Sequence, residues 1–317
     1  MTANLEDGDR LDAASEASAA AAPGPISVPV VAPALTPKHL LLGLTLASGW
    51  LLKERLDPPD GTSGGNFGVG YKATRGGELA FVKAIDFVEA LTARDPLKRL
   101  SELANVASFE KDVLEYCTKV GMTKVLRYIG HEYITYDGST NPMSNVSCLV
   151  MEAGSKDLRH LVNANGLSSC GWNLQVMTDV LLACSQLHKG EVAHQDIKPQ
   201  NVIAVGTLAT DGSLSSMKVG DLGRVVRKDQ PGPFNHLPWP GDRRYGPPES
   251  WYGYETPDWT DAREAQDAYM IGSLLFYLFT GTTLQSQVFN LIPGNFLPGK
   301  WTGGFDQDLK AVLIDAQ

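Results

Sequence analysis

The strongest constraint on the fold is a change in hydrophobic pattern near Gly154. Before this point, most apolar residues fall in short runs bounded by turn-forming residues, which predicts strands. These runs cover residues 50–56, 77–85, 125–136 and 145–153. The stretch 96–119 instead places its apolar residues on one side at helical spacing, namely Leu100, Leu103, Val106, Phe109, Val113 and Leu114. The first half is therefore predicted to be a sheet with one substantial helix.

After Gly154 the pattern becomes helical. Residues 172–188 and 265–281 are long apolar segments with helical periodicity. The second is apolar nearly all round, which predicts a helix buried at the centre of a domain, with Gly281 as its C-cap. Residues 305–317 predict an amphipathic helix that lacks a glycine or proline end signal. We therefore expect that the natural polypeptide continues beyond Gln317 or has been trimmed there.

The first 37 residues differ from the rest of the chain. They are rich in Ala, Ser, Pro, Asp and Glu, and they include an alanine run followed by prolines. Few of these residues offer the apolar surface that would offset the entropy of ordering, so we predict a disordered leader over 1–37. The alternative is a helix over 11–22, formed on alanine propensity alone.

Composition narrows the function classes. The chain of 317 residues has a formal net charge of −9, which gives no electrostatic reason to bind nucleic acid. The acidic N-terminus excludes a secretory signal, and the apolar run 40–52 is too short to span a bilayer core of about 30 Å. None of the four cysteines is at C-x-x-C spacing, which argues against a zinc site. We predict a cytoplasmic protein with neither nucleic acid nor membrane as a partner.

Polar residues gather in the stretch HQDIKPQN, residues 194–201, which follows a predicted helix and is expected on a loop. A carboxylate such as Asp196 can orient a substrate hydroxyl and accept its proton. A lysine such as Lys198 can neutralise a transferring phosphoryl group, and the amide oxygen of Asn201 suits Mg²⁺. Asp221, in the acidic loop that follows, can supply a second hard oxygen ligand.

With these residues in place, the sequence resembles the eukaryotic-like Ser/Thr protein kinase family. The motifs occur in the family's order over most of the chain from about Trp50 onward, which makes the resemblance specific. In the second half they are HQDIKPQN for H-R-D-x-K-P-x-N, Asp221-Leu222-Gly223 for D-F-G, GPPES (246–250) for A-P-E, and Asp267 for the buried acid of the central helix. In the first half they are GGNFGVGYK (64–72) for the glycine-rich loop, AFVK (80–83), EKDVL (110–114) and the hinge LVMEAG (149–154).

The resemblance implies a fold and a division of the chain. The expected fold is α+β and two-lobed, with a small β-rich N-lobe that has one main helix and a larger, mostly helical C-lobe. The N-lobe is assigned to 38–153 and the C-lobe to 154–317, with possible truncation at the C-terminus. The resemblance also implies a protein substrate of unknown identity, and it leaves the oligomeric state open.

The resemblance also implies catalytic roles. Lys83 holds the α- and β-phosphates of ATP and pairs with a carboxylate of the first long helix. Glu110 is the expected partner, although counting from Phe109 by F-x-x-E reaches Asp112 instead. Asp196 is the catalytic base, and Lys198 is the cation beside the γ-phosphate.

Metal and nucleotide ligands follow in the same way. Asn201 and Asp221 are implied to bind Mg²⁺ or Mn²⁺. Met151 is implied to be the gatekeeper at the back of the adenine pocket. The whole implied nucleotide-binding set is Gly65, Asn66, Phe67, Gly68, Lys83, Met151, Glu152 and Gly154.

Departures from the family pattern begin in the first half. Ser63 stands where the first glycine of the loop is expected, which would leave a stiffer loop. Gly70 replaces the valine that packs on adenine, and Phe81 replaces an alanine that does the same. We predict that Phe81 lies over the adenine base in the space vacated at Gly70, because volume-conserving exchanges are tolerated best. The alternative is a shift of register that places Ala80 there and Phe81 in the core of the lobe.

A further departure is Asp242, where serine/threonine kinases usually carry threonine. This aspartate can accept a hydrogen bond from Lys198, but it would repel Asp196 unless it swings away or pairs with an arginine. It puts the serine/threonine preference in question, whereas Lys198 favours that preference. Arg243 and Arg244 follow it and are candidates either for pairing or for contacts with an acidic substrate.

The last departure concerns regulation. In many kinases the arginine of H-R-D anchors a phosphorylated residue of the activation loop, and Gln195 cannot form that pair. No Ser, Thr or Tyr occurs from Leu222 to Arg244. We predict activity that needs no phosphorylation in this stretch, 222–244, which is called the activation segment below. Four prolines stiffen it, and Phe234, Leu237 and Trp239 are its expected packing anchors.

Two other interpretations compete with this one, and an interaction module that uses the acidic leader could coexist with any of the three. A pseudokinase acting as a nucleotide-binding scaffold is compatible with Ser63, Phe81 and Asp242, while intact Lys83 and Asp196 argue against it. A small-molecule kinase shares the catalytic-loop pattern, but GPPES argues against that class.

Overall fold

The computed structural model describes residues 35–56, 68–165, 169–206, 216–254, 256 and 258–316. The predicted leader over 1–37 lies outside the described residues except for its last three positions. At that point a short helix, η1 (Pro37–His39), leads into the first strand. Structural statements below concern these described ranges.

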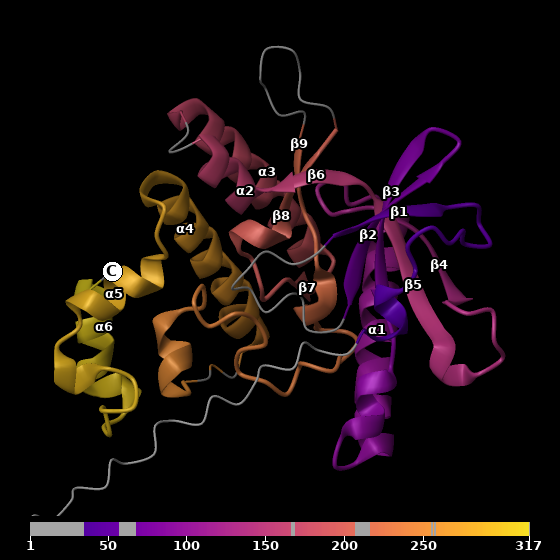
Figure 1. The fold of residues 1–317 in the computed structure, drawn as a ribbon. Coiled ribbons are helices and arrows are strands. Elements are labelled where there is room, and N and C mark those ends of the chain that lie inside the picture. The colour runs from indigo at the N-terminus through magenta and orange to yellow at the C-terminus, as the bar shows by residue number, and fades with distance from the viewer. Residues whose placement is uncertain are drawn as a thin grey trace, which may run out of the picture. The chain divides into compact units, whose positions relative to one another are not determined.

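Five antiparallel strands form the main sheet in the order β1-β2-β3-β5-β4 (Figure 1). Their bounds are β1 Leu51–Leu56, β2 Val69–Arg75, β3 Glu78–Ile85, β4 Tyr128–Thr135 and β5 Asn145–Glu152. Four of them correspond to the predicted strands. The fifth, β2, was not predicted because its sequence reads as part of the glycine-rich stretch. The turn between β2 and β3 uses Gly76 and Gly77, both at positive φ.

The sheet has two chemically different faces. Alternation along β3 sends Ala80, Val82 and Ala84 into a core that includes Trp50 and Tyr71. The intervening residues of β3, Phe81 and Lys83, therefore point to the opposite face, which is the face that carries the site described below.

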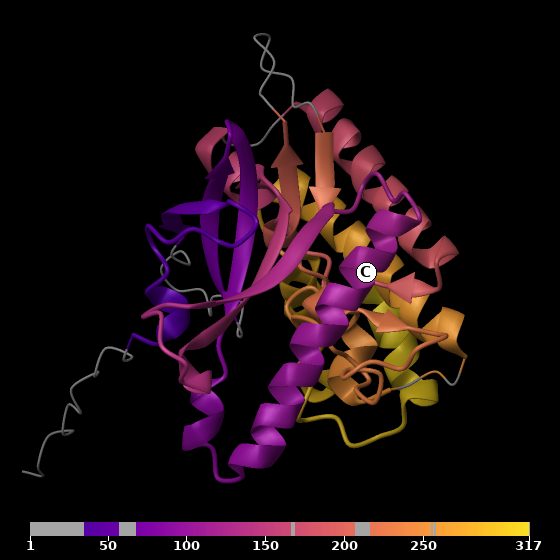
Figure 2. The same ribbon diagram turned by 90° about the vertical axis from the view of Figure 1, so that its right-hand side faces the viewer.

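Helix α1 (Pro96–Lys119) has the bounds expected from its apolar spacing. Asp95 caps its N-terminus by accepting a hydrogen bond from the Lys98 N–H, and Pro96 occupies the first helical position. Its buried side includes Leu103, Phe109 and Val113. The helix runs beside the sheet (Figure 2), and Phe81 of β3 packs on the cluster that its apolar side helps to form.

The remainder is mostly helical. Its helices are α2 Leu158–Asn165, α3 Cys170–Lys189, α4 Ala265–Thr280, α5 Leu284–Leu291 and α6 Lys310–Ala316. Small strands lie between them: β6 Gly154–Asp157, β7 Val192–Ala193, β8 Val202–Val205, β9 Ser216–Val219 and β10 Val226–Arg227. They pair as β6-β8-β9 and β10-β7. Helices α3 and α4 correspond to the predicted segments, and Gly281 ends α4 at φ +73° as expected.

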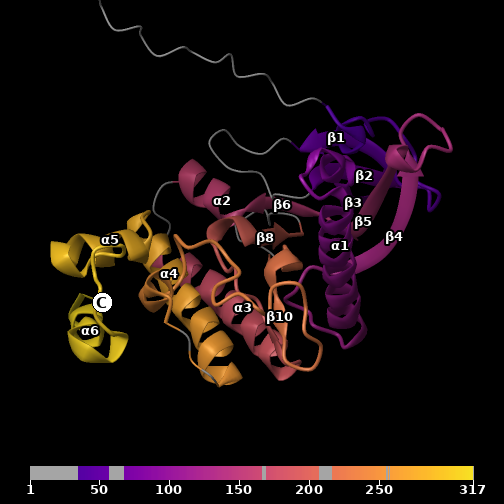
Figure 3. The ribbon, with the colours of Figure 1, turned by 90° about the horizontal axis from the view of Figure 1, so that it is seen from below.

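Short helical turns complete the chain. The 3-10 turns are η2 Val88–Thr92, η3 Pro142–Ser144, η4 Pro199–Asn201, η5 Leu222–Arg224, η6 Pro248–Tyr252 and η8 Gly294–Phe296. Two π-helical turns, η7 (Thr260–Glu264) and η9 (Phe305–Leu309), precede α4 and α6. The predicted terminal helix is therefore a π-helical turn followed by α6. Figure 3 shows α5 and α6 together, on the opposite side of α4 from the main sheet.

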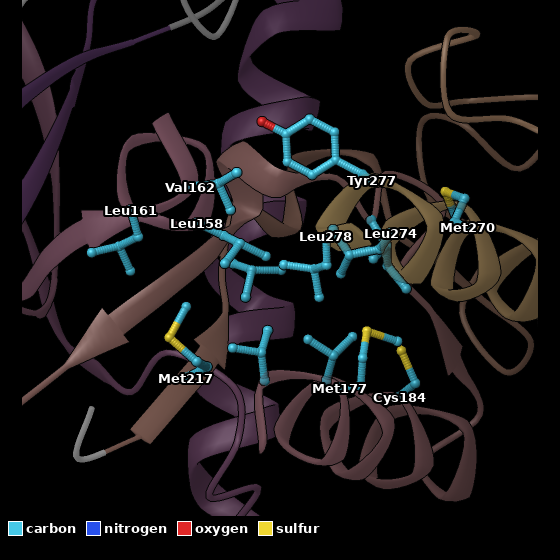
Figure 4. Close-up of a cluster of buried hydrophobic side chains, with 14 of the residues drawn as sticks. Leu158, Leu161, Val162, Met177, Cys184, Met217, Met270, Leu274, Tyr277 and Leu278 are labelled. Carbon is cyan, nitrogen blue, oxygen red and sulfur yellow. The ribbon is translucent and has the colours of Figure 1, made fainter. Parts of the chain in front are cut away.

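Helix α4 corrects one expectation. One side of it packs against α2, α3 and β9 through Met270, Leu274 and Leu278 (Figure 4). The other side is not covered by the described residues, since Leu275 is 39% exposed and Phe279 is 43% exposed. The helix is therefore buried on one side only. Apolar residues all round predicted complete burial, but the neighbouring helices contact only part of its circumference.

The architecture is the predicted α+β fold, with a β-rich lobe holding one main helix and a larger helical lobe. The lobes meet where β5 ends at Glu152 and β6 begins at Gly154. Among the described helices, none combines the length and the apolar character needed to cross a membrane.

Candidate active site

Three charged side chains from distant parts of the chain form the first cluster. Lys83 Nζ lies 2.7 Å from Oε1 and 2.9 Å from Oε2 of Glu110, on α1. The same nitrogen lies 3.1 Å from Oδ1 of Asp221, which lies two residues after the end of β9 at Val219. The Lys83 and Glu110 side chains are 16% and 3% exposed, whereas that of Asp221 is 40% exposed. A buried ion pair thus holds the lysine, and the more open carboxylate faces the outside of the cluster.

Electrostatics in this cluster follow from burial and charge. Burial opposes the charged form of Lys83, but Asp221 and Glu110 outweigh it and raise the lysine pKa. The Lys83 charge lowers the pKa of Asp221 to about 2. Burial raises the pKa of Glu110 against the pull of Lys83, and the Asp221 carboxylate adds to that rise. At neutral pH, Lys83 is therefore cationic and Asp221 is ionised.

The partner of Lys83 was ambiguous from the sequence, and the geometry resolves it. Asp112 lies two residues after Glu110, yet its carboxylate pairs with Lys111 at 2.6 Å. It is 43% exposed. On a helix, residues two positions apart face different directions, so only one of the two acids can point toward β3. The expected pairing with Glu110 is found, and the rival is excluded.

The second cluster surrounds Asp196, which is 5% exposed. Its Oδ2 lies 2.8 Å from Lys198 Nζ and 3.1 Å from Nδ2 of Asn201, which also donates to the Asp196 carbonyl. Its Oδ1 accepts a hydrogen bond of 2.9 Å from the backbone N–H of Asp242. The loop thus brings the acid, the lysine and the asparagine together as the spacing predicted. Both carboxylate oxygens are oriented by donors.

The loop that carries Asp196 is held in place by Asp267 of α4, which is fully buried. Its carboxylate accepts hydrogen bonds from the backbone N–H groups of His194 and Gln195, at 2.7 and 2.8 Å. His188 Nε2 lies 2.9 Å from the same carboxylate. Gln195 is held at φ +63°, an uncommon value for a residue with a side chain. The buried acid anticipated at Asp267 therefore anchors the loop that carries Asp196.

Asp242 adopts the arginine-paired arrangement considered above. Its carboxylate lies 2.7 Å from Nη2 and 3.1 Å from Nε of Arg244, whereas Lys198 is 3.9 Å away. Burial raises the pKa of Asp242, but hydrogen bonds from Arg244 outweigh this and lower it overall. The aspartate is thus kept ionised by Arg244, while its backbone serves Asp196. Arg243 instead lies beside Trp251.

Phe81 lies beside Gly70 as predicted, while its placement over the base stays a prediction. A Cβ atom at position 70 would lie only 2.8 Å from the Phe81 ring. The ring also packs on the cluster that contains Met151 and Leu222. Ala80 belongs to the core on the other face, so the alternative register is excluded. Phe81 therefore occupies space that a side chain at position 70 would need.

The remaining nucleotide candidates lie at the edge of this face. Gly68 lies against Lys83, since a Cβ there would be 3.0 Å from Cγ of the lysine. Met151 is buried at the end of β5, opposite Phe81 in the sheet register. Glu152 binds Lys218 at 2.6 Å, and a Cβ at Gly154 would collide with Ile203. The candidates Gly65, Asn66 and Phe67, together with Ser63, lie outside the described residues.

The protein oxygens at this site fit a magnesium ion that takes its remaining ligands from the phosphates of a substrate. Within the described ranges no group of three His, Cys, Asp or Glu side chains could hold a metal ion by itself. Asn201 uses its amide nitrogen for Asp196, which leaves Oδ1 as its metal-binding atom. Mg²⁺ is commonly held by one or two carboxylates together with substrate phosphates. Asn201 and Asp221 suit that arrangement and do not suit a closed protein site.

Sequence reasoning missed several residues that shape the site. Arg263 contacts the catalytic loop (194–201) from the helical lobe, and His188 contacts the Asp267 carboxylate that anchors this loop. Lys218 fixes Glu152. Their positions carry no motif, and their partners lie far away in sequence. Of the expected anchors, Phe234 and Trp239 are buried, whereas Leu237 is only partly so. The two aromatics are therefore packed rather than exposed, as expected for anchors of the activation segment.

Comparison with known proteins agrees with this geometry. The family model described as the protein kinase domain matches residues 107–291, more than half of the chain. The chain therefore belongs to the protein kinase domain family. The matched region includes Glu110, the catalytic loop, the activation segment and α4.

Curated relatives are protein kinases by name. A probable serine/threonine-protein kinase, PknB of Lactococcus lactis, is 24% identical over 55% of this chain and 26% of its own length. A probable serine/threonine-protein kinase, gdt4 of Dictyostelium discoideum, is 28% identical over 50% of this chain and 9% of its own. The membrane-associated tyrosine- and threonine-specific cdc2-inhibitory kinase wee-1.3 of Caenorhabditis elegans is 25% identical over 45% and 19%, respectively. The matches thus span about a quarter or less of each relative's length.

Proposed function

We propose that this protein transfers the γ-phosphoryl group of ATP to a protein hydroxyl, with serine or threonine as the favoured acceptor, and that it does so without phosphorylation of its activation segment. The observation that carries the proposal is the oriented Asp196 carboxylate. It receives donors from Lys198, Asn201 and the Asp242 backbone on its two oxygens. A carboxylate fixed in this way can accept the proton of a bound hydroxyl.

The charged residues divide the remaining work. Lys83, held by Glu110, presents a cation to the α- and β-phosphates, and Lys198 presents one near the transferring group. Asn201 and Asp221 hold Mg²⁺ or Mn²⁺, which when bound offsets the negative charge of the phosphate oxygens. The lowered pKa of Asp221 suits this role, because an ionised carboxylate is the ligand that a hard cation prefers.

Acceptor preference is supported by Lys198 and by the names of the relatives. Two of them are called serine/threonine kinases, and one is called tyrosine- and threonine-specific. Asp242 binds Arg244 at 2.7 Å and lies 3.9 Å from Lys198, so its contact with the lysine is the longer of the two.

The test measures transfer of labelled phosphate from ATP to three peptide mixtures, in the presence of Mg²⁺ or Mn²⁺. The mixtures differ in whether serine, threonine or tyrosine is the acceptor residue. The wild-type chain is first treated with phosphatase, and Asp196→Ala serves as the inactive control. We expect label on serine or threonine from the treated wild type and none from the variant. Nucleotide binding without transfer under all conditions would contradict the proposal and favour a scaffold. Label on tyrosine alone would contradict the acceptor preference.

A further inference from the structure

Arg263 connects the activation segment to the catalytic loop. It lies in the π-helical turn η7, just before α4. Its guanidinium donates to three backbone carbonyls of the segment, those of Asn235 at 3.1 Å, Leu237 at 2.8 Å and Pro238 at 3.2 Å. A fork of this kind requires arginine, because its donors diverge in a fixed plane whereas a lysine presents one compact ammonium.

The same guanidinium also reaches Gln195 beside the catalytic acid. Nη1 of Arg263 donates to the Gln195 side-chain oxygen at 3.2 Å. The Gln195 amide nitrogen in turn donates to the Arg263 carbonyl at 2.9 Å and to Asp267 at 3.1 Å. Gln195 is completely buried. An arginine at position 195 has no acceptor atom and would set two guanidinium groups against each other, so glutamine suits this contact where arginine does not.

The anchored carbonyls lie a few residues before a contact with Asp196. Pro238 is followed within three residues by Gly241, whose backbone packs on the Gln195 carbonyl so closely that a Cβ would collide with it. The next N–H, that of Asp242, donates to Asp196 Oδ1 at 2.9 Å. The stretch 235–242 is thus held at one end by Arg263 and orients the Asp196 carboxylate at the other.

From these contacts we propose that Arg263 is a positioning residue that fixes the activation segment in the way a phosphate group does in other proteins. Phosphorylation commonly orders such a segment by pairing the added charge with arginine. Here the segment has no hydroxyl side chain from Leu222 to Arg244, and the resident arginine binds its carbonyls instead. This inference rests on the proposed kinase activity.

The experiment compares Arg263→Lys and Arg263→Ala with Arg75→Ala in the full chain. Arg75 is a matched control because it forms an exposed ion pair with Glu78 at the β2–β3 turn. Steady-state transfer gives kcat and the KM for ATP, and amide hydrogen exchange reports protection of the segment. Both Arg263 variants are expected to lower kcat about 100-fold, because small misplacement of catalytic groups is costly. The KM for ATP should stay within about twofold, and exchange should accelerate over 235–242.

Several outcomes decide the proposal. Unchanged protection of 235–242 in both Arg263 variants would overturn it whatever the activity does, and so would a kcat equal to that of Arg75→Ala. If Arg263→Ala unfolds, Arg263→Lys decides, since it keeps the charge and loses only the fork. If the wild type transfers no phosphate, the proposed function fails, and the exchange measurement still decides whether Arg263 holds the segment.

Discussion

The two lysine-centred clusters differ in how they are built. Lys198 lies two residues from Asp196 in one loop, and the contact follows from local backbone geometry. Lys83 meets Glu110 and Asp221 from 27 and 138 residues away. The contact between Lys198 and Asp196 lies within one loop, although Asp242 and Asp267 hold that loop in place. The Lys83 cluster exists only when the sheet, α1 and the loop after β9 are packed together.

The largest effect is expected in the cluster around Asp196. Asp196→Asn keeps the shape of the side chain but removes the proton acceptor, so kcat for transfer should fall by about 10²–10⁴-fold. Initial rates with labelled ATP measure the change, and the exposed Asp315→Asn is the matched control. A variant that retains more than a tenth of the wild-type rate would show that Asp196 does not act as the base.

The next prediction concerns the cluster of Lys83, Glu110 and Asp221. Glu110→Gln removes the charge that holds Lys83, so the lysine should shift and transfer should fall by about 100-fold. Asp112→Asn makes the same chemical change two residues away on the same helix. It should leave the rate within about twofold and stability within about 0.5 kcal/mol. Equal losses in both variants, measured by initial rates and urea unfolding, would remove the distinction between these acids.

The third prediction concerns the packing of Phe81 against Gly70, on the face of the sheet that carries Lys83. Gly70→Val should reduce the free energy of unfolding by about 1–3 kcal/mol, because its side chain collides with the Phe81 ring. Adding Phe81→Ala should recover most of that loss. Gly130→Val in β4 is the control, since no atom lies within 4 Å of a Cβ there. Urea unfolding of the wild type, Gly70→Val, Phe81→Ala and the double variant measures the coupling, and additive losses would argue against shared space.

The smallest effect is expected at Asp242. Asp242→Asn loses its pairing with the exposed Arg244 but keeps the backbone N–H that serves Asp196, so stability at pH 7 should change by about 0.2–1 kcal/mol. The pKa of this carboxyl is lowered in the folded protein. Its contribution is therefore present above the ordinary pKa of about 3.9 and is lost as the pH falls below it. Thermal unfolding from pH 7 to pH 3 should show less acid sensitivity in the variant, and identical profiles would exclude this contribution.

The positions of the main helices followed from local patterns, while contacts between elements did not. The bounds of α1 and the end of α4 at Gly281 could be predicted from spacing and capping. The strand β2 was hidden because glycines interrupt its pattern. The exposed side of α4 was missed because an apolar stripe carries no record of which neighbours cover it. Arg263 was missed because its partners are backbone carbonyls, which have no sequence signature.

The sequence alone determined the chemistry near Asp196, since an acid, a lysine and an asparagine within six residues must share one loop. It also determined that the activation segment has no hydroxyl to phosphorylate, since this is a property of composition. Only the tertiary structure shows that Lys83 pairs with Glu110 and not with Asp112, and that Asp242 pairs with Arg244. It also shows that Arg263 binds backbone carbonyls of the activation segment. Those contacts depend on which side chain points at a distant element, and that direction is fixed by packing rather than by order along the chain.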